Sequence, residues 1–232
     1  GGGGGDAAPR PLSKSELRDF GTAATVFVLV KTKKGGALGT GFLIGPDLVM
    51  TNAHVVENAD LVVAVTEDRE RHLATILSIT KPQVPGDRDF AVLKLAEPTK
   101  AEPVSFSTSY HALDDIVAFG FPGKVTANDR QTADKFDGAD QRALPAVVTS
   151  TGTIQNVIES KLHIEVLTHS AKVSQGNSGG PLFDACGRVV GINTFIAEQS
   201  LTAIVDKKKS KFDIPQGYQW ALASKEMLTF LQ

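Results

Sequence analysis

Short apolar segments separated by glycine, proline and polar residues recur along most of the chain. Twelve of them have the length and the β-branched and aromatic content of strands, and turn-forming residues bound them. They span residues 24–31, 41–44, 47–51, 61–65, 72–80, 90–95, 116–121, 146–155, 162–168, 181–183, 189–196 and 218–222. Because many short strands at this spacing are typical of barrels, we predict an all-β protein made of two six-stranded antiparallel β-barrels.

Two helical patterns flank the predicted strands. Ser13 and Glu16 fit a capping box at the start of a short helix over residues 11–20, and residues 224–231 are amphipathic. The chain then divides into a leader and linker with a short helix (1–20), an N-terminal β-barrel (21–105), a C-terminal β-barrel (106–222) and a C-terminal helix (223–232). The long polar segments 123–144 and 197–216 are predicted as loops that gate the space between the barrels.

Composition and charge bear on the partners of the chain. It has 232 residues and a net charge of −2, which gives no long-range attraction to nucleic acid or to an anionic membrane. No apolar run reaches the roughly 18 residues that a membrane-spanning helix needs. The single cysteine, Cys186, rules out an internal disulfide. We expect no nucleic acid, no membrane segment, no metal and no cofactor, and the oligomeric state stays open.

The first candidate for a catalytic element is a glycine-rich turn, Gln175-Gly176-Asn177-Ser178-Gly179-Gly180-Pro181. Glycine permits backbone angles and close approaches that a Cβ forbids. Such a turn can expose the Ser178 hydroxyl and aim consecutive backbone N–H groups at one point, which suits a nucleophile beside an oxyanion hole. The alternative at this stage is an ordinary serine in a glycine-rich turn.

A serine nucleophile needs a base and a group that orients the base. Of the five histidines, His54 follows a predicted hairpin and begins a short helical turn after Thr51-Asn52, so a rigid element would hold it. The contexts of the others are those of surface or strand histidines: His72, His111, His163 and His169. Asp89 stands at the mouth of the predicted strand 90–95, and Asp87, two residues earlier, is its competitor.

These groups occur in the order His54, Asp89, Ser178, and here the chain resembles the trypsin/chymotrypsin-like serine proteases. The matching segments are Thr51-Asn52-Ala53-His54, Asp89-Phe90-Ala91-Val92-Leu93, Gly176-Asn177-Ser178-Gly179-Gly180-Pro181 and Gly187-Arg188-Val189-Val190-Gly191-Ile192-Asn193-Thr194. The sequences of these segments are most similar to the bacterial branch of this family that includes the high-temperature-requirement proteases, here without a PDZ domain. The resemblance covers residues 22–231, nearly the whole chain.

The resemblance implies a chymotrypsin-like fold in which the two barrels form one catalytic unit. It implies a serine endopeptidase that works through an acyl-enzyme, with the catalytic residues His54, Asp89 and Ser178. The backbone N–H groups of Gly176 and Ser178 would form the oxyanion hole. Protein or peptide substrates would lie in the cleft as an extended strand along Asn193, Thr194 and Phe195.

The primary specificity pocket is open to two interpretations. In the resembled family, the position of Lys172, six residues before Ser178, lies at or near the base of this pocket. A buried Lys172 ammonium would favour an acidic side chain before the scissile bond. If Lys172 instead points outward, the small aliphatic preference of the bacterial relatives is expected.

The sequence also bears on two alternative functions and on the compartment. A catalytically silent, protease-like module that binds peptides is the main alternative, although all three catalytic side chains are present. An α/β-hydrolase esterase would match Gly176-x-Ser178-x-Gly180, but His54 precedes Ser178 and no alternating βα pattern exists. Among compartments, a bacterial periplasmic or secreted setting is favoured over the cytoplasm.

Overall fold

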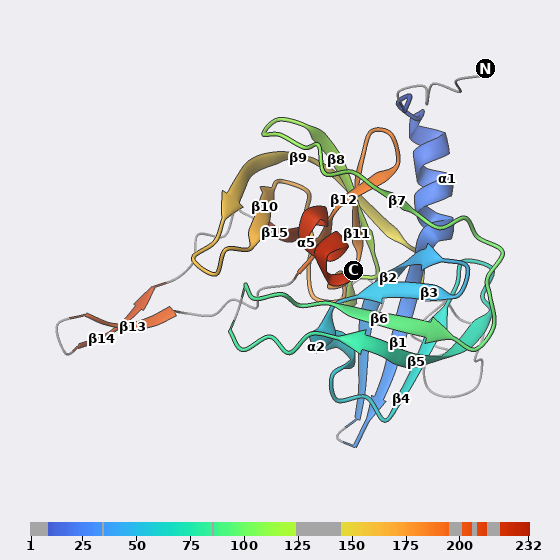
Figure 1. The fold of residues 1–232 in the computed structure, drawn as a ribbon, viewed down its shortest axis with the longest axis horizontal. Helices are drawn as coiled ribbons and strands as arrows, with labels where there is room; N and C mark the ends of the chain where they lie inside the picture. The colour runs from blue at the N-terminus through green and yellow to red at the C-terminus, as the bar shows by residue number, and fades with distance from the viewer. Residues whose placement is uncertain are drawn as a thin grey trace.

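The first half of the chain closes into a six-stranded β-barrel. The computed structural model describes residues 9–33, 35–84, 86–123, 145–194, 201–205, 208–212 and 219–232. The barrel strands, in spatial order, are β1 (Thr25–Thr32), β2 (Gly35–Gly45), β3 (Leu48–Thr51), β6 (Ala91–Leu95), β5 (Arg71–Ile79) and β4 (Leu61–Val65). The four-residue helix α2 (Ala53–Val56) leads from β3 towards β4 and lies beside the strands of the first barrel (Figure 1).

The second half forms another closed ring of six strands. In spatial order they are β11 (Pro181–Asp184), β8 (Asp115–Gly120), β9 (Val148–Glu159), β10 (Glu165–His169), β15 (Gln219–Ala223) and β12 (Arg188–Asn193). The pairing of β11 with β12 closes the ring, and every pairing within it is antiparallel. The short strand β7 (Ser105–Phe106) adds to β12 in parallel. The predicted fold, two six-stranded antiparallel barrels with a C-terminal helix, is therefore confirmed.

Two longer helices lie against the barrels. Helix α1 (Lys14–Ala24) begins with the predicted capping box, in which Ser13 and Glu16 satisfy each other's backbone N–H groups. It continues four residues beyond the predicted end at 20, and the Thr25 hydroxyl then donates to the Gly21 carbonyl at 2.6 Å. Helix α5 (Ser224–Phe230) follows β15 directly and packs next to the second barrel (Figure 1).

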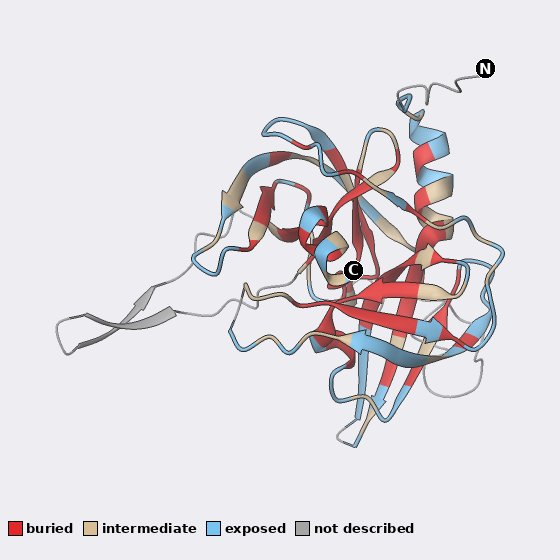
Figure 2. Ribbon diagram, in the orientation of Figure 1, coloured by how far each residue is buried: buried red, intermediate tan, exposed pale blue. Residues whose placement is uncertain are grey.

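One hydrophobic cluster joins the two barrels. Phe42, Met50 and Phe90 of the first half pack in the same cluster as Phe119 and Phe183 of the second. All five are at most 1% exposed, and burying one such side chain contributes about 1.5–3 kcal/mol. The buried segments meet where the barrels touch (Figure 2). This shared core gives the barrels a fixed relative position, which any site between them requires.

Three segments differ from the prediction or lie beyond what the structure describes. Strands β13 (Leu201–Val205) and β14 (Lys208–Phe212) pair as a separate two-stranded sheet, where a loop over 197–216 was predicted. Strand β7 was missed because two residues are too few to show a period. Most of the predicted loop 123–144 lies outside the described residues. Within the described residues, no helix has the length and apolarity needed to cross a bilayer.

Helix α5 is tied to the first half through one buried carboxylate. Glu226, 6% exposed, accepts from Arg88 Nε at 2.9 Å and from the Glu165 backbone N–H at 3.0 Å. Glu226→Ala removes both bonds, so we expect the free energy of unfolding to fall by about 1–3 kcal/mol in urea denaturation. Lys225→Ala is the matched control, because the Lys225 side chain is 64% exposed and 3.8 Å from Glu165. Equal losses in both variants would contradict the role given to Glu226.

Candidate active site

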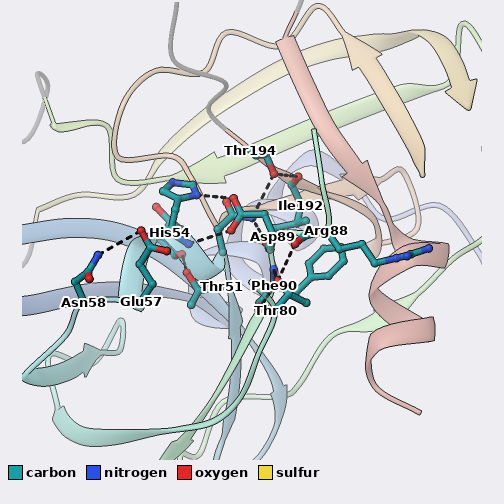
Figure 3. A network of polar contacts seen from close by, with 12 residues as sticks. Thr51, His54, Glu57, Asn58, Thr80, Arg88, Asp89, Phe90, Ile192 and Thr194 are labelled. Carbon is teal, nitrogen blue, oxygen red and sulfur yellow. Dashed lines mark hydrogen bonds and ion pairs between the residues drawn. The ribbon is translucent and has the colours of Figure 1, made fainter. Parts of the chain in front are cut away.

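A histidine and a buried aspartate form a close pair at the junction of the barrels. The His54 Nδ1 atom lies 2.5 Å from Asp89 Oδ2, and the His54 backbone N–H donates to Asp89 Oδ1 at 2.9 Å. The Asp89 side chain is 9% exposed, whereas the His54 side chain is 38% exposed. Both oxygens of the Asp89 carboxylate therefore interact with His54, while part of the imidazole ring stays exposed to solvent. Figure 3 shows the pair beside Thr194.

Strand pairing explains why these two residues meet. β3 and β6 are neighbours with Thr51 opposite Ala91, so the end of β3 and the start of β6 lie side by side. His54 follows β3 in helix α2, and Asp89 precedes β6. Asn52, between them, donates from Nδ2 to the Asp89 carbonyl at 2.7 Å and to Thr194 Oγ1 at 3.2 Å. Asp87, the competing carboxylate, accepts from the backbone N–H groups of Gln83 and Arg88 within its own loop.

The glycine-rich turn that carries Ser178 packs against the first barrel. The Thr40 N–H donates to the Ser178 carbonyl at 3.0 Å, and the Gly179 N–H donates to the Asn193 carbonyl at 2.9 Å. Gly179 has φ +84°, and a Cβ there would lie 2.1 Å from the Thr40 carbonyl oxygen. Glycine is thus required both for the backbone angle and for the close approach. The turn therefore holds Ser178, from the second barrel, beside β2 of the first barrel.

The Gly176 end of the turn is held by two further hydrogen bonds. The Gly123 N–H donates to the Gln175 carbonyl at 2.8 Å, and Thr40 Oγ1 donates to the Gly176 carbonyl at 2.7 Å. Thr40 Oγ1 also accepts from the Phe121 N–H at 3.0 Å. Thr40 therefore joins two segments of the second barrel to β2. Sequence inspection gave no signal for Thr40, because its partner Gly176 lies 136 residues away.

The remaining residues assigned from the sequence are placed differently. Asn193 is buried and bonded to the serine turn, and Thr194 is partly buried and bonded to Asn52. Lys172 is exposed, and its backbone N–H donates to Ser150 Oγ at 2.7 Å. Of the two interpretations of Lys172, the structure therefore agrees with the outward one, and the ammonium group is not buried. Phe195 lies outside the described residues. No group of three or more His, Cys, Asp or Glu side chains that could hold a metal occurs among the described residues.

Thr40 gives a direct test of the link between the barrels. Thr40→Val keeps the side-chain shape but leaves the buried Gly176 carbonyl and Phe121 N–H without this partner. We expect the free energy of unfolding to fall by about 1–3 kcal/mol, measured by urea denaturation with Trp220 fluorescence. Thr40→Ser retains the hydroxyl and should lose clearly less. If both variants lose the same amount, packing rather than hydrogen bonding explains Thr40.

Known proteins of similar sequence are proteases. The trypsin-like peptidase domain matches residues 39–192 of the chain. The magnetosome formation protease MamE of Paramagnetospirillum magneticum is 30% identical over 201 residues, which are 83% of this chain and 24% of that protein. A probable periplasmic serine endoprotease, DegP-like, of Chlamydia pneumoniae is 31% identical over 174 residues, 72% of this chain and 30% of that protein. The chain therefore spans less than a third of the length of these relatives.

Solved structures share the two-barrel arrangement. The active form of the Rv3671c protease from M. tuberculosis matches with a TM-score of 0.68 and 25% identity, over 97% of this chain and 87% of that chain. The HtrA-type protease AlgW with a tripeptide matches with a TM-score of 0.69 and 21% identity, over 95% of this chain and 63% of that chain, which shows the fold. Since the domain match over residues 39–192 includes His54, Asp89 and Ser178, the chain belongs to the trypsin-like peptidase domain family.

Proposed function

We propose that this chain is a serine endopeptidase that hydrolyses peptide bonds through an acyl-enzyme. One observation carries the proposal: the imidazole of His54 is held by a buried carboxylate at 2.5 Å, and the Ser178 turn is hydrogen-bonded to the barrel that carries this pair. A serine needs both an adjacent base and a group that orients that base. Family membership and the names of the relatives agree with this chemistry.

The geometry of the His54–Asp89 pair supports the following proton transfers. Because Nδ1 of His54 faces the Asp89 carboxylate, the Nδ1–H tautomer is favoured and Nε2 is left to accept a proton. In this proposal Ser178 Oγ attacks the scissile carbonyl carbon while its proton moves to His54 Nε2. The imidazolium is stabilised by Asp89 and then gives the proton to the leaving amine. Water, deprotonated by the same nitrogen, hydrolyses the acyl-enzyme and frees Ser178.

The backbone around Gly176 supports an oxyanion hole. The carbonyl of Gln175 and the N–H of Gly176 belong to one trans peptide, so they point in opposite directions. Because the carbonyl is held by the Gly123 N–H, the Gly176 N–H is turned away from residue 123. Together with the Ser178 N–H, the Gly176 N–H would stabilise the negative oxygen of the tetrahedral intermediate.

The substrate in this proposal is a protein or peptide bound in extended form. The end of β12 and the residues that follow it, Asn193, Thr194 and Phe195, would pair with the substrate backbone by strand addition. No cofactor is needed for this reaction. A bacterial periplasmic or secreted location belongs to the same proposal, since the curated relatives include probable periplasmic endoproteases.

Replacement of the nucleophile tests the function itself. Ser178→Ala should lower the rate of peptide cleavage by up to about a million-fold, as loss of the nucleophile does in similar triads. A fluorogenic peptide assay measures this, and a fluorophosphonate should label the wild-type chain at Ser178 only. A wild-type chain that binds peptides but neither cleaves them nor becomes labelled would instead be a silent binding module.

Replacement of the orienting carboxylate tests its role separately. Asp89→Asn keeps the shape but favours the other His54 tautomer, and the cleavage rate should fall by about 10⁴-fold. Asp87→Asn is the matched control and should leave the rate almost unchanged, because the hydrogen bonds of the Asp87 side chain among the described residues lie within its own loop. A larger loss in Asp87→Asn than in Asp89→Asn would reverse the assignment of the two carboxylates.

A further inference from the structure

One buried histidine stands apart from the catalytic pair. His169, the last residue of β10, has 0% exposure, and neither of its ring nitrogens has a hydrogen-bond partner within the described part of the chain. The Asn193 amide and the Ala171 backbone lie near enough to offset part of the desolvation, but without hydrogen-bond geometry. Burial lowers the pKa of His169 to about 4, so the ring is neutral at pH 7. Buried polar groups without partners are rare and call for an explanation.

A second unpartnered group lies beside the serine turn. Asn193, 1% exposed, donates from Nδ2 to the carbonyls of Gly180 and Pro181 at 3.2 and 3.3 Å, which leaves Oδ1 without a partner among the described residues. Its backbone is bonded to the same turn, because its carbonyl accepts from Gly179 and its N–H donates to Gly180 at 2.8 Å. Asn193 is therefore joined to the two residues that follow Ser178.

Strand register places His169 and Asn193 on the same face of the sheet. β15 lies between β10 and β12, and its Ala221 is opposite both Leu167 and Asn193. His169 is two residues after Leu167 on β10, so it shares the face of Leu167 and Asn193. The small Ala221 side chain separates the two strands there. Thr194, the neighbour of Asn193, contacts Asn52 and so points the other way, towards the catalytic pair.

We propose that His169 and Asn193 form the polar floor of the subsite for the P1 side chain, the one before the scissile bond, and that this floor selects a carboxamide, glutamine or asparagine. The proposal rests on the proposed function. Asn193 bonds to the turn that carries Ser178, which places it beside that turn, and in this proposal its Oδ1 atom lines the subsite of the residue that acylates Ser178.

The hydrogen-bond donor of His169 and the acceptor of Asn193 together match an amide side chain. A neutral imidazole offers one N–H donor, and Asn193 Oδ1 offers one acceptor. A carboxamide accepts from the first with its oxygen and donates to the second with its NH2 group. An aliphatic side chain would leave both groups unpaired, and sites built for hydrogen bonds discriminate strongly against such analogues.

An acidic side chain is disfavoured for a different reason. A carboxylate would face the Asn193 oxygen, and it would need a cation that a neutral imidazole does not supply. Lys172, the basic residue expected near this subsite, is exposed. The carboxamide is therefore the P1 side chain that fits the described groups best.

The test uses the full chain and peptides that are identical except for Gln, Asn, Glu, Val or Ala at P1. For the wild type, we expect kcat/KM with Gln or Asn to exceed the Glu, Val and Ala values at least tenfold. In His169→Leu, the value for the amide peptides should fall at least 100-fold, while the Val peptide changes less than threefold. His111→Leu, which replaces an exposed histidine, is the matched control and should leave all values unchanged.

Fluorophosphonate labelling of Ser178 in each variant separates this proposal from the proposed function. A labelled wild type that prefers Val, Ala or Glu overturns the subsite alone, and this holds even if His169→Leu does not fold. A labelled His169→Leu that loses all peptides equally also overturns it, because that loss would be structural. A wild type that is neither labelled nor able to cleave overturns the proposed function, and the subsite with it.

Discussion

The buried carboxylate of Asp89 is the constraint on which the rest of the site depends. A charge removed from water is costly unless hydrogen bonds replace its hydration. Asp89 receives this replacement from the backbone N–H and the ring of His54, and Asn52 fixes its carbonyl. All three bonds require the end of β3 to lie beside the start of β6. The register of the first barrel is therefore tied to the geometry of the His54–Asp89 pair.

The second constraint is that Ser178, the proposed nucleophile, comes from the other barrel. Its turn can approach β2 only because Gly179 has no Cβ, and the Thr40 hydroxyl then bridges the Gly176 carbonyl and the Phe121 N–H. The shared aromatic cluster supplies the contact area that keeps this approach in place. On the opposite side, Glu226 and Arg88 join helix α5 to the loop of Asp89. Packing thus fixes the barrels, and a few directional bonds set the positions of the reacting groups.

What the sequence predicts well is local. Alternating apolar residues indicate twelve strands of the two barrels, because each pattern is complete within a few residues. The catalytic assignment likewise rests on three short segments with distinctive neighbours. The pair β13 and β14 was missed because the lysines of 207–211 suggest a solvated loop, although strand pairing needs only backbone groups.

What the sequence does not predict is contact between distant segments. Thr40 is an ordinary strand residue until Gly176 comes within 2.7 Å of it. Lys172 stands at a position that suggests a pocket, yet only the path of the backbone decides that its side chain faces outward. His169 looks like any strand-end histidine, because the absence of a partner is a property of its surroundings and not of its neighbours in the chain.

Asp89 and His169 differ in how the cost of their burial is compensated. Both are buried titratable groups, yet the Asp89 carboxylate has a partner for each oxygen, and the His169 ring has none for either nitrogen within the described chain. The fold supplies a partner for each oxygen of Asp89. At position 169, a leucine would avoid the cost of burying an imidazole without partners. Departures from local consistency of this kind concentrate at functional sites, where a ligand supplies the missing partner. A substrate side chain that bonds to His169 and Asn193 would lie against the turn that holds Ser178, so recognition and positioning of the scissile bond would be one event.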